Sequence, residues 1–190
     1  MLRDIKRLYE RAEQENMEFH QGVALIMRSF NFGIIADTWG DAPYTNAINA
    51  PAGKQEDLFP VFDSQETIYK GIIEDLKTAN TLLSKPRESY SGIVEEQDVI
   101  YRGDLLKWRK FANSLMLRYY MRVSSKLPDF AKAGIEEIVS NPSTFPIFTS
   151  NSDDANMDYV GSSESDSWPA STKFDNSESN FSRVQLGVLS

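Results

Sequence analysis

The stretch MEFHQGVALIMRSFNFGIIAD, residues 17–37, decides the fold class of this 190-residue chain. Its apolar residues recur at every third or fourth position, which is the spacing of an α-helix. One stripe holds Val23, Ile26, Met27, Phe30 and Ile34, and the other side holds Leu25, Phe32 and Ile35. A helix that is apolar around most of its circumference is normally buried between neighbours. The stretch therefore predicts a central helix in a helical core.

Helical spacing predicts four more helices, each with a recognisable beginning or end. Asp63 or Ser64 can cap one of them, with Glu66 at the capping-box distance from Asp63, and Asp104 can cap another. Pro128 suits the first turn of the last helix. The predicted ranges are 2–15, 63–84, 105–124 and 128 to just before Asn141. The fold class predicted from these patterns is all-α.

Two stretches lack any periodic pattern. Residues 38–62 contain several glycines and prolines together with aromatic residues, and a connection of this length is usually functional or disordered. After residue 142, Ser, Asn and Asp dominate, and the apolar run at 184–189 looks like the start of another buried element. We therefore expect a helical part at 1–141 and a loop-rich segment of the same domain at 142–190, truncated at its C-terminus.

Composition excludes several classes of function. The net charge of −8 opposes nucleic-acid binding, which needs a cationic surface. The absence of cysteine excludes thiolate catalysis and cysteine metal sites, and His20, the only histidine, is better explained as an interior residue than as a ligand. No two carboxylates have a spacing that suggests glycosidase chemistry. We expect a protein that is not an enzyme.

Residues 39–44, Trp-Gly-Asp-Ala-Pro-Tyr, form the most suggestive local motif. Aromatic rings can stack on the apolar faces of sugars, and a carboxylate can accept hydrogen bonds from sugar hydroxyls. Trp39, Asp41 and Tyr44 are therefore candidate glycan-binding residues. The alternative is that both rings fold back over the end of the preceding helix. Trp108, by contrast, has the spacing of a core residue.

Two features of the later sequence could also bind ligands. Trp168 follows a polar stretch and is a fourth glycan-binding candidate, although it could instead plug its own loop. Residues 151–158 contain several Asn and Asp oxygens that could hold calcium, but they do not follow the EF-hand pattern. A solvated acidic loop fits these residues better, and we predict no metal site and no cofactor.

Several phrases occur in the order found in SusD/RagB-like outer-membrane nutrient-binding lipoproteins. The chain resembles this family most clearly at residues 35–44, which contain the pattern D-x-[YW]-G-D-x-P-Y. Other similar phrases are 62–69, 75–79, 100–115 and 153–159. The similarity is greatest to the starch-binding-associated SusD-like subgroup.

This resemblance implies tetratricopeptide-like helix pairs with long irregular loops that face the ligand. It implies non-catalytic binding of oligosaccharides at the surface of a Bacteroidetes-type cell, and delivery to a SusC-like TonB-dependent outer-membrane transporter. The family's signal peptide and lipidated cysteine would then precede this internal fragment, and the membrane would be reached only through that lipid anchor.

Two other functions are compatible with the sequence. Some branches of the family bind peptides. A helical protein–protein scaffold without a small ligand is also compatible with the sequence, and its partner would contact the cations on the expected outer face of helix 105–124. The expected contacts are Lys107, Arg109, Lys110 and Arg118, and Arg122 lies on the same face.

Overall fold

The computed structural model describes residues 1–49, 58–157 and 159. The chain separates into two units, Met1–Ala155 and Asn156–Ser190, and all described helices belong to the first. Only three residues of the second unit are described. The fold below is that of the first unit.

Five α-helices make up the unit: α1 (Leu2–Gln14), α2 (Glu18–Trp39), α3 (Gln65–Leu82), α4 (Leu105–Val123) and α5 (Pro128–Ser140). Short 3-10 turns η3 (Arg87–Ser89), η4 (Glu95–Gln97) and η5 (Asn151–Asp153) lie in the connections. The described part of the chain contains one isolated β-bridge and no strand. The all-α prediction is confirmed, and each predicted helix lies within a few residues of an observed one. None of the described helices is long and apolar enough to cross a membrane.

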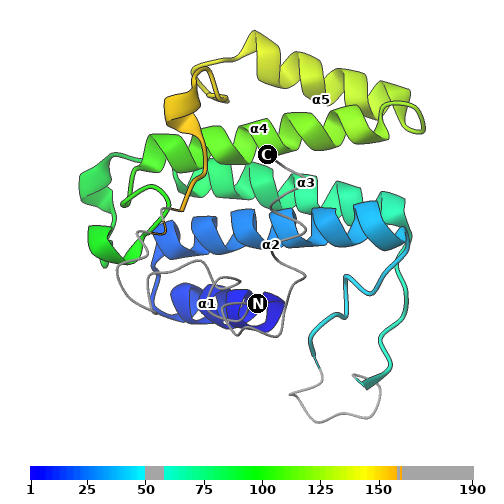
Figure 1. Cartoon of the computed structure of the whole chain (residues 1–190), viewed down its shortest axis with the longest axis horizontal. Helices are drawn as coiled ribbons and strands as arrows, with labels where there is room; N and C mark the ends of the chain where they lie inside the picture. The colour runs from blue at the N-terminus through cyan, green and yellow to red at the C-terminus, as the bar shows by residue number, and fades with distance from the viewer. Residues whose placement is uncertain (50–57, 158, 160–190) are drawn as a thin grey trace, which may run out of the picture. The chain divides into compact units, whose positions relative to one another are not determined.

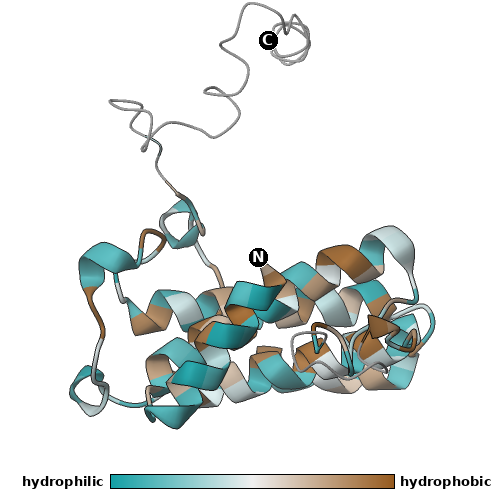
Figure 2. Ribbon diagram, turned by 90° about the horizontal axis from the view of Figure 1, so that it is seen from below, coloured by the Kyte–Doolittle hydropathy of each residue, from teal (hydrophilic) through white to brown (hydrophobic). Residues whose placement is uncertain are grey.

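The helices pack in the order of the chain, each beside the next, as Figure 1 shows. Hydrophilic and hydrophobic colours alternate along each ribbon in Figure 2, as expected of helices with one buried side. The core lies where α2, α3 and α4 meet, and Ile26, Ile72 and Met116 there are fully buried. Trp108 is also buried, at 2% exposure, so its assignment to the core is confirmed.

Two helical glycines allow tyrosine side chains to enter the core. A Cβ atom added at Gly71 would lie 2.5 Å from the ring of Tyr44. Gly33 leaves similar room for Tyr119, whose hydroxyl donates to the carbonyl oxygen of Ser29 at 3.1 Å. Tyrosine rings therefore occupy space that any larger residue at these positions would fill.

Of the two residues predicted as the possible N-cap of α3, the structure shows one. Ser64 is the N-cap, and its hydroxyl accepts from the Thr67 amide at 3.2 Å. The cap by Asp63 is wrong, because the backbone of Asp63 pairs with Ala42 and its carboxylate accepts from the loop after α2. The predicted Asp104 cap of α4 is confirmed by a 3.0 Å bond from the Lys107 amide.

The segment after α5 returns to α4 and is held there by buried polar groups. Asp153 is only 4% exposed and forms an ion pair with Lys110 at 2.8 Å. The expectation of a solvated acidic loop is therefore wrong for Asp153, although Asn151 and Asp154 are exposed. Asp158 lies outside the described residues. The predicted boundary at 142 stays a prediction, because most of 142–190 is not described.

Candidate ligand-binding site

The loop that follows α2 is braced against the first turn of α3. Gly40 turns the chain with a φ of 75°, a conformation that glycine adopts without steric cost. The Asp41 carboxylate then accepts a hydrogen bond from the Gln65 backbone amide at 2.8 Å. Asp41, a predicted glycan contact, thus has a structural partner at the helix N-terminus.

Asp63 fixes the same loop from the other side. Its carboxylate accepts from the backbone amides of Tyr44 and Thr45, at 3.0 and 2.8 Å. The hydrogen bond from the Thr45 amide is the main reason that the pKa of Asp63 lies below its usual value. The backbone of Ala42 pairs with that of Asp63 at 3.0 and 3.2 Å. Residues 41–45 are therefore held in one geometry.

Trp39, the last residue of α2, and Tyr44, in the braced loop, differ in exposure. Trp39 is 70% exposed, whereas Tyr44 is 7% exposed and packs edge-to-face on Phe32 with ring centroids 4.8 Å apart. The alternative that both rings cover the end of α2 holds for Tyr44 and fails for Trp39. Trp168 lies outside the described residues.

Two exposed aromatic residues near this loop were not among the predicted contacts. Phe59 and Phe62 are 79% and 68% exposed. They precede Asp63 in the antiparallel Ala42–Asp63 bridge, so they lie on the opposite side of this bridge from Trp39. Exposed apolar residues that occur together often mark a binding surface. Their signal in the sequence was the unusual share of aromatic residues in a segment with no helical pattern.

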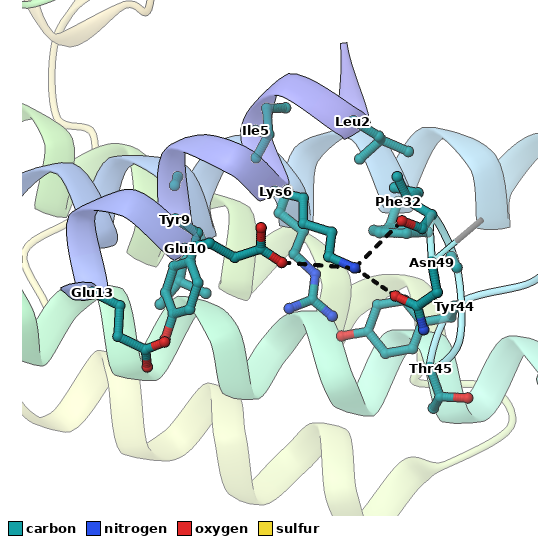
Figure 3. A pocket seen from close by; sticks show the side chains of 15 residues that line it. Leu2, Ile5, Lys6, Tyr9, Glu10, Glu13, Phe32, Tyr44, Thr45 and Asn49 are labelled. Atoms are coloured by element: carbon teal, nitrogen blue, oxygen red, sulfur yellow. Dashed lines mark hydrogen bonds and ion pairs between the residues drawn. The ribbon is translucent and has the colours of Figure 1, made fainter. Parts of the chain in front are cut away.

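Tyr44 also lines a cavity of about 280 Å³ between α1, α2 and residues 44–49. In Figure 3, Lys6 extends from α1 toward the loop, while Tyr9, Glu10 and Glu13 line the cavity farther along the same helix. The Lys6 ammonium donates to the side-chain oxygen of Asn49 at 2.5 Å and to the carbonyl oxygen of Ile48 at 3.3 Å, so α1 is fastened to the loop across the cavity.

A charged cluster forms the inner wall of the cavity. The Arg28 guanidinium lies 5.2 Å from the ring centroid of Tyr44 and 5.9 Å from that of Phe32, and its Nη1 is 3.5 Å from the Asp75 carboxylate. Burial raises the pKa of Asp75 despite the nearby Arg28, and burial together with Asp75 raises the pKa of Tyr44. Neither Arg28 nor Asp75 was predicted as a site residue. The sequence feature that could have indicated Arg28 is its position as a lone cation in the apolar stretch 17–37.

The predicted cationic outer face of α4 is only partly free. Arg109 donates to the side chain of Asn80 and to the Thr144 carbonyl, Lys110 pairs with Asp153, and Arg122 lies 3.3 Å from Asp37. These cations hold the unit together, which weakens the case for a docking face built from them.

His20 is partly buried, but it is not a satisfied interior residue. Its Nδ1 atom is buried without a hydrogen-bond partner in the described part of the chain, and burial lowers the pKa of the ring. No group of three or more His, Cys, Asp or Glu residues is placed to hold a metal ion within the described residues.

Comparison with known proteins identifies the family. The SusD-like_2 model, described as "Starch-binding associating with outer membrane", matches residues 1–185. The chain belongs to the SusD-like family. This family consists of non-catalytic binding proteins associated with the outer membrane. A search of curated proteins found no match.

Solved structures of SusD-like proteins share the fold. An outer-membrane protein from Bacteroides vulgatus, described as involved in nutrient binding, is 30% identical with a TM-score of 0.71. The match covers 86% of this chain and 34% of that protein. A SusD/RagB family protein from Bacteroides thetaiotaomicron is 31% identical, with a TM-score of 0.65 and coverages of 83% and 31%.

A chitin-binding SusD homolog from Flavobacterium johnsoniae is 25% identical, with a TM-score of 0.67. The match covers 80% of this chain and 31% of that protein. The chain therefore spans about a third of the length of the SusD-like structures that it matches. The tetratricopeptide-like helical fold implied by the resemblance is confirmed.

Proposed function

We propose that this chain is part of a protein that binds oligosaccharides without catalysis at the outer surface of the cell. The observation that carries the proposal is the 70% exposure of Trp39, the last residue of α2, beside the braced loop of a SusD-like chain. An exposed indole ring can stack on the apolar face of a pyranose.

Two further exposed aromatic residues could bind sugar rings beyond the Ala42–Asp63 bridge. Phe59 and Phe62 are exposed on the segment that the Ala42–Asp63 bridge ties to the loop. Several stacked sugar rings can together give micromolar affinity, about −8 kcal/mol, after the cost of association. Asp41 and Tyr44 contribute mainly by shaping the loop, since their side chains contact α3 and α2. Trp168 remains a further candidate.

We also propose that the protein is a surface-exposed lipoprotein that delivers its ligand to a SusC-like TonB-dependent transporter. The outer-membrane association of the SusD-like family supports this proposal. Weak, aromatic-dominated binding suits such a role, because the ligand must be released to the transporter. Co-purification of a transporter barrel with the membrane-anchored protein would test it.

Affinity electrophoresis tests the binding proposal. The full chain should migrate more slowly in native gels that contain soluble starch, solubilised chitin or xylan, in at least one of the three. Trp39→Ala should weaken the affinity for that polysaccharide about tenfold and reduce the retardation accordingly, because stacking on an aromatic ring is lost.

Met121→Ala is the matched control, since Met121 is 59% exposed on α4 and lies outside the loop. Its retardation should equal that of the wild type. Absence of retardation in all three gels, combined with retention on immobilised peptides, would assign the protein to the peptide-binding branch instead.

A further inference from the structure

The cavity beneath α1 contains polar groups that the fold does not use. The Arg28 guanidinium has five N–H donors, and within the described residues its one polar partner is Asp75, at 3.5 Å. The Tyr9 hydroxyl and the Glu13 carboxylate also face the cavity, and neither has a hydrogen bond to another described side chain. Beyond these contacts, Arg28, Tyr9 and Glu13 keep hydrogen-bonding capacity that a ligand in the cavity can use.

Most charges around the cavity are already paired: Lys6 lies 3.8 Å from Glu10, and Arg28 lies 3.5 Å from Asp75. Its lining has two cations, Lys6 and Arg28, and two carboxylates, Glu10 and Glu13. Lys6 is already engaged by Ile48 and Asn49. An anionic ligand would compete with Glu10 and Asp75 for the two cations, and a cationic ligand would compete with Lys6 and Arg28 for the carboxylates. The lining favours a neutral ligand that both donates and accepts hydrogen bonds.

The other side of the cavity is apolar. Ile5, Leu25, Phe32 and Ile48 contribute carbon surface opposite the charged groups. A pyranose ring has the same division, with C–H groups on its faces and hydroxyls at its edge. The volume of about 280 Å³ lies just below the usual range of about 300–1,000 Å³ for small-molecule sites. This size admits one sugar ring and excludes a chain.

We infer that the cavity between α1, α2 and residues 44–49 is a separate subsite for a single neutral pyranose, such as the terminal residue of a captured oligosaccharide. Arg28 and Tyr9 donate to the hydroxyls of this sugar, and Glu13 accepts from them. The inference rests on the proposed glycan-binding function and adds to it a monosaccharide-sized site that is distinct from the Trp39 surface.

Saturation-transfer difference NMR on the full chain tests the subsite with five methyl β-D-glycosides. Three are neutral, the glucoside, the galactoside and the N-acetylglucosaminide; one is the anionic glucuronide and one the cationic glucosaminide. At least one neutral glycoside should bind, with a dissociation constant about tenfold or more below those of both charged probes, because a charged probe must compete with the ion pairs already formed around the cavity.

Three variants locate the bound sugar. Ala47→Leu places a larger side chain at the cavity wall and should abolish the signal. Tyr9→Phe and Glu13→Gln change only the polar groups on the surface of α1, and each should weaken binding about three- to tenfold. Glu136→Gln removes the charge of an exposed carboxylate on α5 and should leave binding unchanged.

The failure of this inference can be told apart from the failure of the proposed function. If the chain is retarded in a polysaccharide gel but no neutral glycoside binds, the subsite is refuted while glycan binding stands. The subsite is also refuted if none of the three cavity variants changes the affinity for a neutral glycoside. It is refuted as well if a charged glycoside binds as tightly as the neutral ones. Absence of both retardation and glycoside binding overturns both proposals.

Discussion

Gly71 decides whether Tyr44 can occupy the core. A methyl group at this position would lie 2.5 Å from ring atoms of Tyr44, well inside van der Waals contact. We expect Gly71→Ala to lower the free energy of unfolding by about 1–3 kcal/mol, the usual cost of overpacking, even though alanine favours helices. Urea denaturation measures the change.

The exposed Glu74, one turn along α3, supplies the control, and Glu74→Ala should leave the unfolding free energy nearly unchanged. A smaller residue at position 44 should relieve the clash, so Tyr44→Leu combined with Gly71→Ala should cost less than the sum of the two single changes. Strict additivity would mean that the ring and the glycine do not interact.

The pKa of the Asp153 carboxyl depends on the contacts that hold the segment after α5 against α4. Hydrogen bonds from Lys110 and then from the Thr149 amide lower the pKa of Asp153 to about 2, against an ordinary value of about 3.9. Because the pKa is lower in the folded state, the stabilisation is fully present above about pH 4 and is lost as the pH falls through about 2.

Carboxyl-detected NMR titration should therefore give Asp153 a pKa near 2, and Lys110→Met should raise it above 3. The difference in urea midpoint between wild type and Asp153→Asn should be constant from pH 7 to 5 and shrink toward pH 2. Asp154→Asn, at the exposed neighbour, is the control. A difference that does not change with pH would show that the ion pair is not its source.

At the scale of elements, buried amides join the returning segment to α3 and α4. Asn80 is 4% exposed, and its side-chain oxygen accepts from Arg109 at 3.0 Å and from Asn113 at 3.1 Å. Its amide donates to the carbonyl oxygen of Thr144 at 3.1 Å. Asn113 donates in turn to the Pro146 carbonyl at 2.9 Å. These bonds hold the backbone of the segment, in addition to the Asp153 side chain that pairs with Lys110.

Asn80→Ala should cost about 2–3 kcal/mol of unfolding free energy, because it leaves buried donors of Arg109 and Asn113 unpaired. Limited proteolysis should then cleave residues 142–150 faster than in the wild type. Asn141→Ala removes an exposed amide that bonds only within α5, and its cleavage rate should stay at the wild-type level. Equal cleavage of both variants would contradict the clamp.

The helices could be predicted from the sequence because their information is local. Apolar spacing, Asp104 and Pro128 lie within a few residues of the elements that they define. The orientation of loop side chains could not be predicted, since it depends on distant partners. Asp63 binds amides 18 and 19 residues away, and Tyr101 donates to the Asp153 carbonyl 52 residues away. For the same reason Trp39 and Tyr44, equivalent in the motif, separate into an exposed and a buried ring.

At the scale of the whole unit, sequential packing predicts unequal stability among the helices. Each helix packs chiefly against its neighbours in the chain, as in repeat proteins, where stability depends on interfaces between adjacent elements. The terminal helices bury little: α1 buries Ile5 and Ala12, and α5 buries Ala131, Gly134 and Ile138. The three central helices bury seven to ten residues each.

Native-state hydrogen exchange should therefore show α1 and α5 opening before α3, with amide protection at least tenfold lower, about 1.4 kcal/mol. A sugar in the cavity would bind only while α1 is docked, and by linkage it would stabilise that docking. A saturating neutral methyl glycoside should consequently slow exchange in α1 and leave α5, which has no contact with the cavity, at its original rate. Equal slowing in both helices would instead indicate a general effect of the solute on the whole unit.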